Sequence, residues 1–385
     1  MTPQARVAAA IDILDQIAAG LPAEQALLRW SRGSRFAGSG DRAAVRDLVF
    51  DALRCRDSFA AWGGKGDGRG LMLGRIRAAG DDPALTFTGQ GHAPAPLDAV
   101  EQASGAPPDA AQAMNLPDWL HPIWAASLGD QAVPIAHAMT GRAPVWLRVN
   151  TAKSTALKAI SALAADGIEA EADPRLPTAL QVRAGSRRIN GSAAYRDGLV
   201  ELQDLSPQLA CASLPLRDGM RVLDYCAGGG GKALALAARA DLRIEAHDAD
   251  PRRMADLPAR AARAGAKIGV VARPEGQYDL VIADVPCSGS GTWRRSPDAK
   301  WKFKSQDLDK ISNVQDDILA ALTGHIAPGG YLAYMTCSLL REENDQRIDD
   351  FLSKTGDYRL IERRLWTPLD ASDGFFLALL QRKTG

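Results

Sequence analysis

One strand-like run of this 385-residue chain ends in four consecutive glycines and reads Val222-Leu223-Asp224-Tyr225-Cys226-Ala227-Gly228-Gly229-Gly230-Gly231-Lys232. An alanine-rich, helix-like stretch follows directly. Glycines let a backbone approach a ligand closely, and the first N–H groups of a helix are free to bind polar atoms. The loop is not a Walker loop, because Ala233 follows Lys232 where that motif needs Ser or Thr. The run predicts a strand–loop–helix unit that binds a nucleotide-like cofactor, with a plain tight turn as the alternative.

The next strand-like run ends in Ala246-His247-Asp248. An acid at the end of a second strand, about 20 residues after the glycines, suits the two hydroxyls of a ribose. A solvated aspartate is the structural alternative. The glycine loop and Asp248 together fit NAD and S-adenosylmethionine equally well, so other motifs must decide between these cofactors.

Residues 219–382 alternate strand-like and helix-like stretches around this loop. Strands are expected at 221–225, 243–247, 267–272, 279–283, 331–336 and 375–380, and helices at 232–240, 252–264, 307–324 and 342–354. This alternation predicts an α/β domain with a mostly parallel, doubly wound sheet.

Two cysteines are expected at the carboxyl ends of two of these strands, where open α/β sheets place their chemistry. Cys287 lies in Asp284-Val285-Pro286-Cys287-Ser288-Gly289-Ser290-Gly291, and Cys337 lies in Thr336-Cys337-Ser338. Both thiols are candidate nucleophiles, and Asp284 adds a carboxylate beside the first. A transient redox disulfide is the alternative, although neither cysteine belongs to a Cys-x-x-Cys motif.

A basic and aromatic stretch lies between the two cysteine motifs and reads Thr292-Trp293-Arg294-Arg295-Ser296-Pro297-Asp298-Ala299-Lys300-Trp301-Lys302-Phe303-Lys304. Cations pair with phosphates, and aromatic rings stack on exposed bases. The stretch therefore predicts contact with nucleic acid, while a solvated loop is the alternative.

Composition narrows the class of protein further. A hydrophobic content of 46% and a charged content of 24% are typical of a globular protein, and no apolar run is long enough for a membrane span. The N-terminus does not look like a signal peptide, and five scattered cysteines indicate a reducing cytoplasm. We expect Cys55 and Cys211 to be buried as small hydrophobic residues. Because the net charge is zero, any nucleic-acid binding would depend on local basic surfaces.

The N-terminal part differs from residues 219–382 because its apolar pattern is mostly helical. Residues 7–60 repeat apolar positions at helical spacing, and a glycine-rich stretch at 63–70 is expected to end the helical domain. Residues 81–118 read as a linker, and residues 144–200 as a small α+β module.

These motifs closely resemble the RsmB/Nop/Sun family of RNA (cytosine-C5) methyltransferases, in particular its bacterial ribosomal-RNA branch. The paired Pro-Cys and Thr-Cys-Ser motifs carry the resemblance, together with the glycine loop, Arg294-Arg295-x-Pro297-Asp298-x-Lys300-Trp301 and Glu342-Glu343-Asn344. The resemblance implies three parts: a NusB-like helical RNA-binding domain with its linker at 1–140, a small α+β RNA-binding module at 141–210, and a Rossmann-like class I methyltransferase domain at 211–385. It also implies a cytoplasmic enzyme, which we expect to be a monomer without metal.

The resemblance also implies roles for individual residues. Cys337 would be the nucleophile that attacks C6 of cytosine, Cys287 would help to complete the reaction and release the product, and Asp284 would hydrogen-bond the edge of the base. S-adenosylmethionine would be held by Cys226, Ala227, Gly228, Gly229, Gly230, Gly231, Lys232, Asp248 and Asp284. The RNA would be contacted by Arg294, Arg295, Lys300 and Trp301.

Two features depart from the family pattern. The loop has glycine at 228 and 229, where the family usually has alanine and proline, and residues 270–277 lack the Asp that usually contacts adenine. Ribosomal RNA of the small subunit is the expected substrate, with transfer RNA as the alternative. A non-catalytic RNA-binding or assembly factor is a second alternative, whereas a dehydrogenase would not require paired cysteines at strand ends.

Overall fold

The computed structural model describes residues 1–384, which form two compact units. One unit comprises Met1–Arg142 and Trp293–Phe303, and we call it the helical unit. The other comprises Ala143–Thr292 and the chain from Lys304 onward, and we call it the catalytic unit. The connection between residues 292 and 304 therefore leaves the catalytic unit and returns to it.

The helical unit is built on the amphipathic pattern expected for residues 7–60. Its helices are α1 (Pro3–Ala18), α2 (Ala23–Gly33), α3 (Ser39–Arg54), α4 (Arg56–Gly63), α5 (Gly68–Ala78), α6 (Ala99–Ala103), α7 (Ala110–Met114), α8 (His121–Leu128), α9 (Ala132–Ala138) and α15 (Pro297–Lys302). Ile13, Val45 and Val49 are among the fully buried residues of its core. The helical prediction for this region is confirmed.

The glycine-rich stretch does not end the helical domain as expected. Helix α5 begins within it, and Asp67 caps this helix by accepting a hydrogen bond from the Gly70 N–H at 2.7 Å. A Cβ atom at Gly74 would lie 1.8 Å from the Phe59 carbonyl oxygen. These glycines therefore allow α4 and α5 to pack backbone against backbone. In the sequence the same glycines look like turn residues, and the stretch was therefore predicted to be a break.

The catalytic unit begins with a four-stranded antiparallel sheet in the order β2-β3-β1-β4. Its elements are β1 (Val145–Val149), α10 (Ala156–Ala165), β2 (Glu169–Asp173), β3 (Leu176–Ala184), α11 (Ala193–Arg196) and β4 (Val200–Leu202). Leu147, Leu163 and Leu180 form part of a buried core between the sheet and its helices. We call this part the small module.

A seven-stranded sheet in the order β10-β11-β9-β8-β5-β6-β7 forms the larger part of the catalytic unit. Its strands are β5 (Arg221–Asp224), β6 (Arg243–Ala246), β7 (Ile268–Val270), β8 (Tyr278–Asp284), β9 (Ile326–Thr336), β10 (Tyr358–Trp366) and β11 (Phe375–Arg382). Strands β5 to β9 are parallel, whereas β10 and β11 are antiparallel additions. The predicted mostly parallel, Rossmann-like sheet is confirmed.

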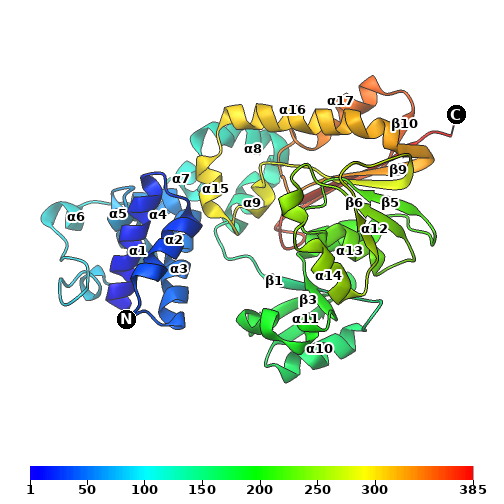
Figure 1. Cartoon of the computed structure of the whole chain (residues 1–385). Helices are drawn as coiled ribbons and strands as arrows, with labels where there is room; N and C mark the ends of the chain where they lie inside the picture. The colour runs from blue at the N-terminus through cyan, green and yellow to red at the C-terminus, as the bar shows by residue number, and fades with distance from the viewer. Residues whose placement is uncertain (385) are drawn as a thin grey trace. The chain divides into compact units, whose positions relative to one another are not determined.

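Alternate residues along the strands enter two separate cores. Val222 and Leu280 pack with α12 (Leu205–Ser213) and α13 (Gly231–Ala237) on one face. Leu223 and Val281 pack with α16 (Ser305–Leu322) and α17 (Asp345–Lys354) on the other face (Figure 1). Because both faces are covered, the central strands read as continuous apolar runs.

The strand order reverses direction at β5. The chain runs from β5 outward to β6 and β7, and then returns to β8 on the other side of β5. In open α/β sheets, ligands bind in the crevice at the carboxyl ends of the strands that flank such a reversal. The glycine loop follows β5, and the first cysteine motif follows β8, so both lie at this switch point.

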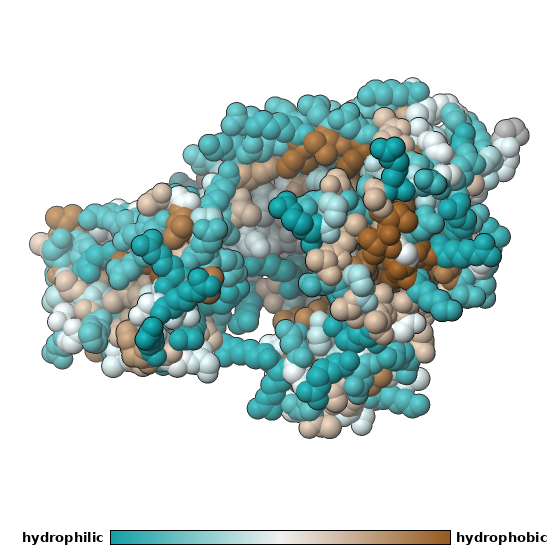
Figure 2. Space-filling view, viewed as in Figure 1, coloured by the Kyte–Doolittle hydropathy of each residue, from teal (hydrophilic) through white to brown (hydrophobic). Residues whose placement is uncertain are grey.

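Hydrophilic residues cover most of the face shown in Figure 2, with smaller apolar patches between them. Among residues 1–384, no helix combines the length and the apolar character that crossing a membrane requires.

Candidate active site

The two cysteines predicted to act together lie side by side. Strands β8 and β9 are parallel neighbours, and the Val285 N–H donates a hydrogen bond to the Met335 carbonyl at 3.0 Å just beyond them. The Cys287 and Cys337 sulfur atoms are 3.3 Å apart, and both residues are partly exposed. The separation indicates two free thiols in hydrogen-bonding contact that can reach one substrate atom.

A buried carboxylate, Glu343, joins the loops that carry these cysteines. It accepts hydrogen bonds from the Ser288 N–H at 2.7 Å and from the hydroxyls of Ser288 and Ser338, each at 2.5 Å. Gln315 donates to the same carboxylate at 3.2 Å, and to the Pro286 carbonyl at 2.9 Å. Ser288 and Ser338 each follow a cysteine in the chain, so Glu343 fixes the position of one thiol relative to the other.

Burial and neighbouring groups influence the protonation of Cys287 and Glu343. The hydrogen bond with Cys337, together with burial, raises the pKa of Cys287 well above its ordinary value. Burial also raises the pKa of Glu343, although the hydroxyls of Ser288 and Ser338 oppose that change. Cys287 therefore retains its proton at neutral pH and can donate it to the Cys337 sulfur.

The glycine loop and the predicted ribose-binding acid are adjacent in the structure. The Gly228 N–H donates a hydrogen bond to Asp248 Oδ2 at 2.9 Å. Gly228 and Gly230 have φ angles of 50° and 73°, in the left-handed region that favours glycine. The loop ends at the N-terminus of α13, where Asp224 Oδ2 accepts a hydrogen bond from the Ala233 N–H at 3.1 Å.

Lys232, the last residue of the loop, forms an ion pair with Asp284 at the end of β8. Burial alone would lower the pKa of Lys232, but the ion pair with Asp284 outweighs that cost and raises it. The pair joins the cofactor loop to the strand that leads to Cys287. Asp284 thus contacts the cofactor loop from the end of β8, and its two expected roles stay predictions.

Asp224 and Cys226 lie at the base of the loop. Burial raises the pKa of Asp224 to about 7, although Lys232 opposes the change. Asp224 Oδ1 is buried and has no hydrogen-bond partner within the described chain. Burial also raises the pKa of Cys226 to about 12, so this thiol stays protonated and is not a third nucleophile. Cys211 is buried in the core as predicted, whereas Cys55 is only partly buried.

The basic stretch lies partly in the interior of the helical unit. Arg294 and Lys300 were expected to contact RNA, but both are buried inside the helical unit, at 7% and 4% exposure. The Arg294 carbonyl accepts a hydrogen bond from Arg54 Nε at 2.7 Å, and Lys300 Nζ donates to the Arg54 carbonyl at 3.2 Å. Burial and the bond to Arg54 argue against direct contact of Lys300 with RNA, and RNA contact by Arg294 stays a prediction.

The other two residues of this group differ from each other. Trp301 Nε1 donates to the Leu53 carbonyl at 2.7 Å, and Arg56 lies over the indole ring at 4.9 Å. The indole is only partly buried, but its polar atom is already used inside the helical unit. Arg295 is exposed, so RNA contact stays a prediction for it.

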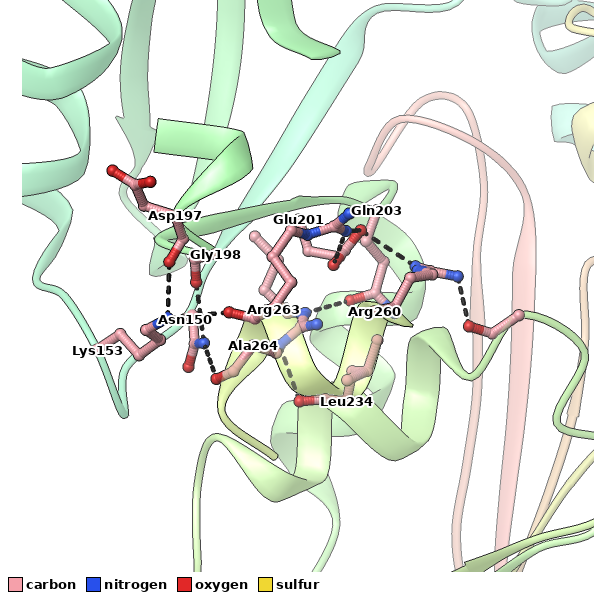
Figure 3. Close-up of polar contacts among 12 residues, drawn as sticks. Asn150, Lys153, Asp197, Gly198, Glu201, Gln203, Leu234, Arg260, Arg263 and Ala264 are labelled. Carbon is pink, nitrogen blue, oxygen red and sulfur yellow. Dashed lines mark hydrogen bonds and ion pairs between the residues drawn. The ribbon is translucent and has the colours of Figure 1, made fainter. Parts of the chain in front are cut away.

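The small module is fastened to the helices that follow the cofactor loop (Figure 3). Asn150 Nδ2 donates to the carbonyls of Gly198 and Ala264, at 3.0 and 2.8 Å. Arg148 bonds both Gln203 within the module and the Leu234 carbonyl on α13, at 2.7 and 3.2 Å. These residues were not predicted as part of a site. The sequence offered one signal: Arg148 and Asn150 are polar residues in or beside an apolar strand, and a buried polar side chain needs a hydrogen-bond partner.

No group of three or more His, Cys, Asp or Glu side chains within residues 1–384 is arranged to hold a metal ion. The polar side chains at the strand ends are instead paired with one another or with the backbone. The chemistry available at this site consists of two thiols, a lysine–aspartate pair and a glycine loop.

Solved structures share this fold. The structure of PH0851 matches with a TM-score of 0.76 at 22% identity and covers 99% of both chains. The structure of NSun6 from Pyrococcus horikoshii with SFG matches with a TM-score of 0.62 at 17% identity, over 70% of this chain and 98% of that one. The sheet and its helices define a Rossmann-like methyltransferase fold.

Sequence comparisons identify the family. Residues 211–381 match the family described as 16S rRNA methyltransferase RsmB/F, and residues 116–187 match the ferredoxin-like domain of RsmF/B-like methyltransferases. Ribosomal RNA small subunit methyltransferase B of Cronobacter sakazakii is 33% identical over 288 residues, which are 69% of this chain and 67% of the relative. The Xanthomonas campestris protein of the same name is 33% identical over 297 residues, 71% of this chain and 68% of the relative. The chain belongs to the RsmB/F family of methyltransferases.

Proposed function

We propose that this protein transfers a methyl group from S-adenosylmethionine to C5 of a cytosine in small-subunit ribosomal RNA. The observation that carries the proposal is the pair of thiols 3.3 Å apart at the ends of adjacent strands, beside the glycine loop. The names of the relatives support ribosomal RNA as the substrate. A substrate of this kind, with five free cysteines, supports a cytoplasmic location.

The glycine loop fits S-adenosylmethionine. Two of its glycines adopt left-handed φ angles that side chains avoid, and the loop opens at the N-terminus of α13. The unpartnered Oδ1 atom of Asp224 can accept a hydrogen bond at the base of the loop. Residues Cys226–Lys232, Asp248 and Asp284 would hold the cofactor, which supplies an electrophilic methyl group when bound.

Cys337 would begin the reaction by adding its thiolate to C6 of the cytosine. Addition to C6 moves electrons toward N3, and a proton delivered there makes C5 nucleophilic. The base has to leave its stack to reach thiols at the ends of β8 and β9. The Cys287 sulfur lies within hydrogen-bonding distance of the Cys337 sulfur, at 3.3 Å.

Cys287 would act in the second stage. After methylation, C5 carries both its hydrogen and the new methyl group. Loss of the C5 proton to a base, loss of the proton at N3 and departure of Cys337 from C6 as a thiolate then restore the aromatic ring. Cys287 lies beside the bond that breaks, so its sulfur is placed to assist release. Asp284, held by Lys232, would hydrogen-bond the edge of the base.

The experiment compares single cysteine variants with small-subunit ribosomal RNA and S-adenosylmethionine. Cys337→Ala is expected to show neither methylation nor covalent adduct. Cys287→Ala is expected to accumulate an RNA–protein adduct that survives denaturing electrophoresis. Cys211→Ala, a buried thiol in the core, is the control and should retain activity. If Cys287→Ala abolished the adduct while Cys337→Ala trapped it, the two roles would have to be exchanged.

The helical unit and the small module would place the RNA. We propose that the exposed basic residues of both parts bind RNA, and that the domain division expected at residues 140 and 210 reflects separate RNA-binding parts. Deletion of the chromosomal gene followed by bisulfite sequencing of ribosomal and transfer RNA tests the substrate. Loss of one 5-methylcytosine in small-subunit ribosomal RNA is expected, and loss in transfer RNA would contradict the proposal.

A further inference from the structure

Two side chains connect the cofactor loop to the small module: Gln203 Nε2 donates a hydrogen bond to the Gly231 carbonyl at 3.4 Å, and Arg260 bridges Gly229 and Glu201. This arginine lies on α14 (Leu257–Ala264), and its Nη1 donates a hydrogen bond to the Gly229 carbonyl oxygen. Its Nη2 pairs with Glu201 Oε1 at 3.2 Å (Figure 3). Glu201 lies on β4 of the small module, so Arg260 joins that module to Gly229.

The loop requires external support because of its composition. Four consecutive glycines lose more conformational freedom on ordering than any other run of four residues would. Two contacts restrain the start of the loop: Asp248 holds the Gly228 N–H, and Arg260 holds the Gly229 carbonyl. A Cβ atom at Gly229 would lie 2.5 Å from Arg260 Nη1. The arginine thus occupies the space that a side chain at position 229 would fill.

Glu201 is buried, at 5% exposure, and serves two arginines. It pairs with Arg263 through both carboxylate oxygens at 2.8 Å, and with Arg260 at 3.2 Å. Arg263 also stacks on Tyr195 of the small module, with its guanidinium carbon 4.1 Å from the ring centroid. The two arginines share one acceptor, but it is Arg260 that bonds the glycine loop.

We propose that Arg260 is a positioning residue for the cofactor loop, and that Glu201 orients it, so that docking of the small module orders the loop. The inference rests on the proposed function for the identity of the ligand, S-adenosylmethionine. A guanidinium with two fixed acceptors has one orientation, whereas one without Glu201 can rotate away from Gly229. Coupling between two binding equilibria is reciprocal. If docking of the small module raises the affinity for the cofactor, bound cofactor must stabilise the docked module to the same extent.

The test measures the Kd of S-adenosylmethionine by calorimetry for the full chain and its variants. Arg260→Met is expected to raise Kd about tenfold, since a charge-assisted hydrogen bond to the loop is lost. Arg260→Lys can reach only one of the two acceptors and is expected to raise Kd about threefold, about half of that free energy. If the Arg260→Met protein folds poorly, the Kd of the Arg260→Lys protein still tests the proposal. Unchanged affinity in both variants would overturn the proposal.

Arg263→Met is the matched control. It removes the stronger ion pair of Glu201, but the Arg263 side chain makes no hydrogen bond to the loop that would be lost with it. It is expected to lower Tm at least as much as Arg260→Met does, while Kd stays within about twofold of wild type, below the effect of one hydrogen bond. A rise in Kd equal to that of Arg260→Met would show that general packing, and not the bond to Gly229, controls affinity.

The role of Glu201 is tested by a double-mutant cycle. Glu201→Gln alone is expected to raise Kd, but it should add nothing in the Arg260→Met background. A further independent rise would place its effect elsewhere and overturn the relay. If the wild-type protein itself does not bind S-adenosylmethionine, the proposed function fails. If wild type binds and Arg260→Met binds equally well, only this inference fails.

Discussion

The connection between β8 and β9 contains two neighbouring stretches with opposite placements. The first, residues 287–292, stays in the catalytic unit, and Glu343 holds Ser288 within it. The second, residues 293–303, belongs to the helical unit, where Lys300 and Arg294 are buried. The first stretch is small and nearly uncharged, yet it forms the site. The second contains four basic residues, yet two of them lie in an interior.

The difference shows that charge is a poor guide to a binding surface when the partner of each charge is unknown. Lys300 resembles a phosphate-binding residue in the sequence, but its ammonium group bonds the Arg54 carbonyl. Glu343 resembles a solvated acid, but four donors from two loops and a helix surround it. The long-range partners, which lie up to 246 residues away in the chain, decide which charge is functional.

The largest effect is expected at Glu343, which holds the first stretch in place. Glu343→Ala should lower the rate of methyl transfer at least about 100-fold, because a displacement of about 1 Å between reacting groups costs that much. Single-turnover transfer of labelled methyl groups measures the rate. Glu343→Gln should lose less, since its amide oxygen can still accept from one serine. The exposed Asp309→Ala on α16 is the control. If the Glu343→Ala protein reacted at a rate close to that of wild type, the positioning role would be contradicted.

A second prediction concerns the end of the same stretch. A Cβ atom at Gly291 would lie 2.4 Å from the Gly374 carbonyl oxygen. Gly291→Ala should therefore lower the free energy of unfolding of the catalytic unit by about 1–3 kcal/mol, as overpacking does. Urea denaturation measures it. Gly324→Ala is the control, because nothing lies within 4 Å of its Cβ position. Equal stability of the two variants would indicate that the connection moves freely.

A third prediction uses pH to test the burial of the second stretch. Burial lowers the pKa of Lys300 to about 8, so the folded protein favours the neutral amine. Between this value and the unfolded pKa, the unfolded chain binds more protons, and stability therefore rises with pH. From pH 7 to pH 9.5, wild type should gain about 2 kcal/mol relative to Lys300→Met. Urea denaturation at both pH values measures the gain. A pH-independent difference would mean that Lys300 is solvated.

The smallest effect is expected for RNA binding by the second stretch. The exposed Arg295→Ala should weaken binding to a ribosomal RNA fragment about threefold and reduce the salt dependence by about one ion. Lys300→Met should leave the affinity unchanged, because its ammonium group faces the interior. Filter binding at several salt concentrations measures both. A larger loss for Lys300→Met than for Arg295→Ala would reverse the comparison between exposed and buried charge.

The fold was predictable wherever the pattern was local. All six expected strands of the large sheet are present, because buried parallel strands read as apolar runs bounded by turns. Strand β10 was not expected, since its residues include Arg359, Glu362, Arg363 and Arg364. An edge strand with a solvated face has no apolar run, and only its pairing with β11 marks it as a strand. Helix α15 was hidden in the basic stretch for a similar reason.

The candidate site was predictable only in outline. The positions of Cys287 and Cys337 at strand ends, and of the glycine loop after β5, follow from periodicity and motif spacing. The motif that contains Glu343 was visible, but its role was not. The contact between Arg260 and the loop was not visible either, because no spacing rule relates Arg260 to Gly229, which lies 31 residues earlier in the chain.

Local sequence is thus sufficient for the alternation of strands and helices, for the flexible loop and for two thiols at one edge of a sheet. These features depend on side chains within a few residues of one another, whose periodicity is readable. The contact between the two sulfurs, the carboxylate that joins their loops, the support of Gly229 and the burial of Lys300 depend on pairing register and helix packing. Contacts across many residues form only once the chain is folded, and that folded arrangement makes two ordinary cysteines a site.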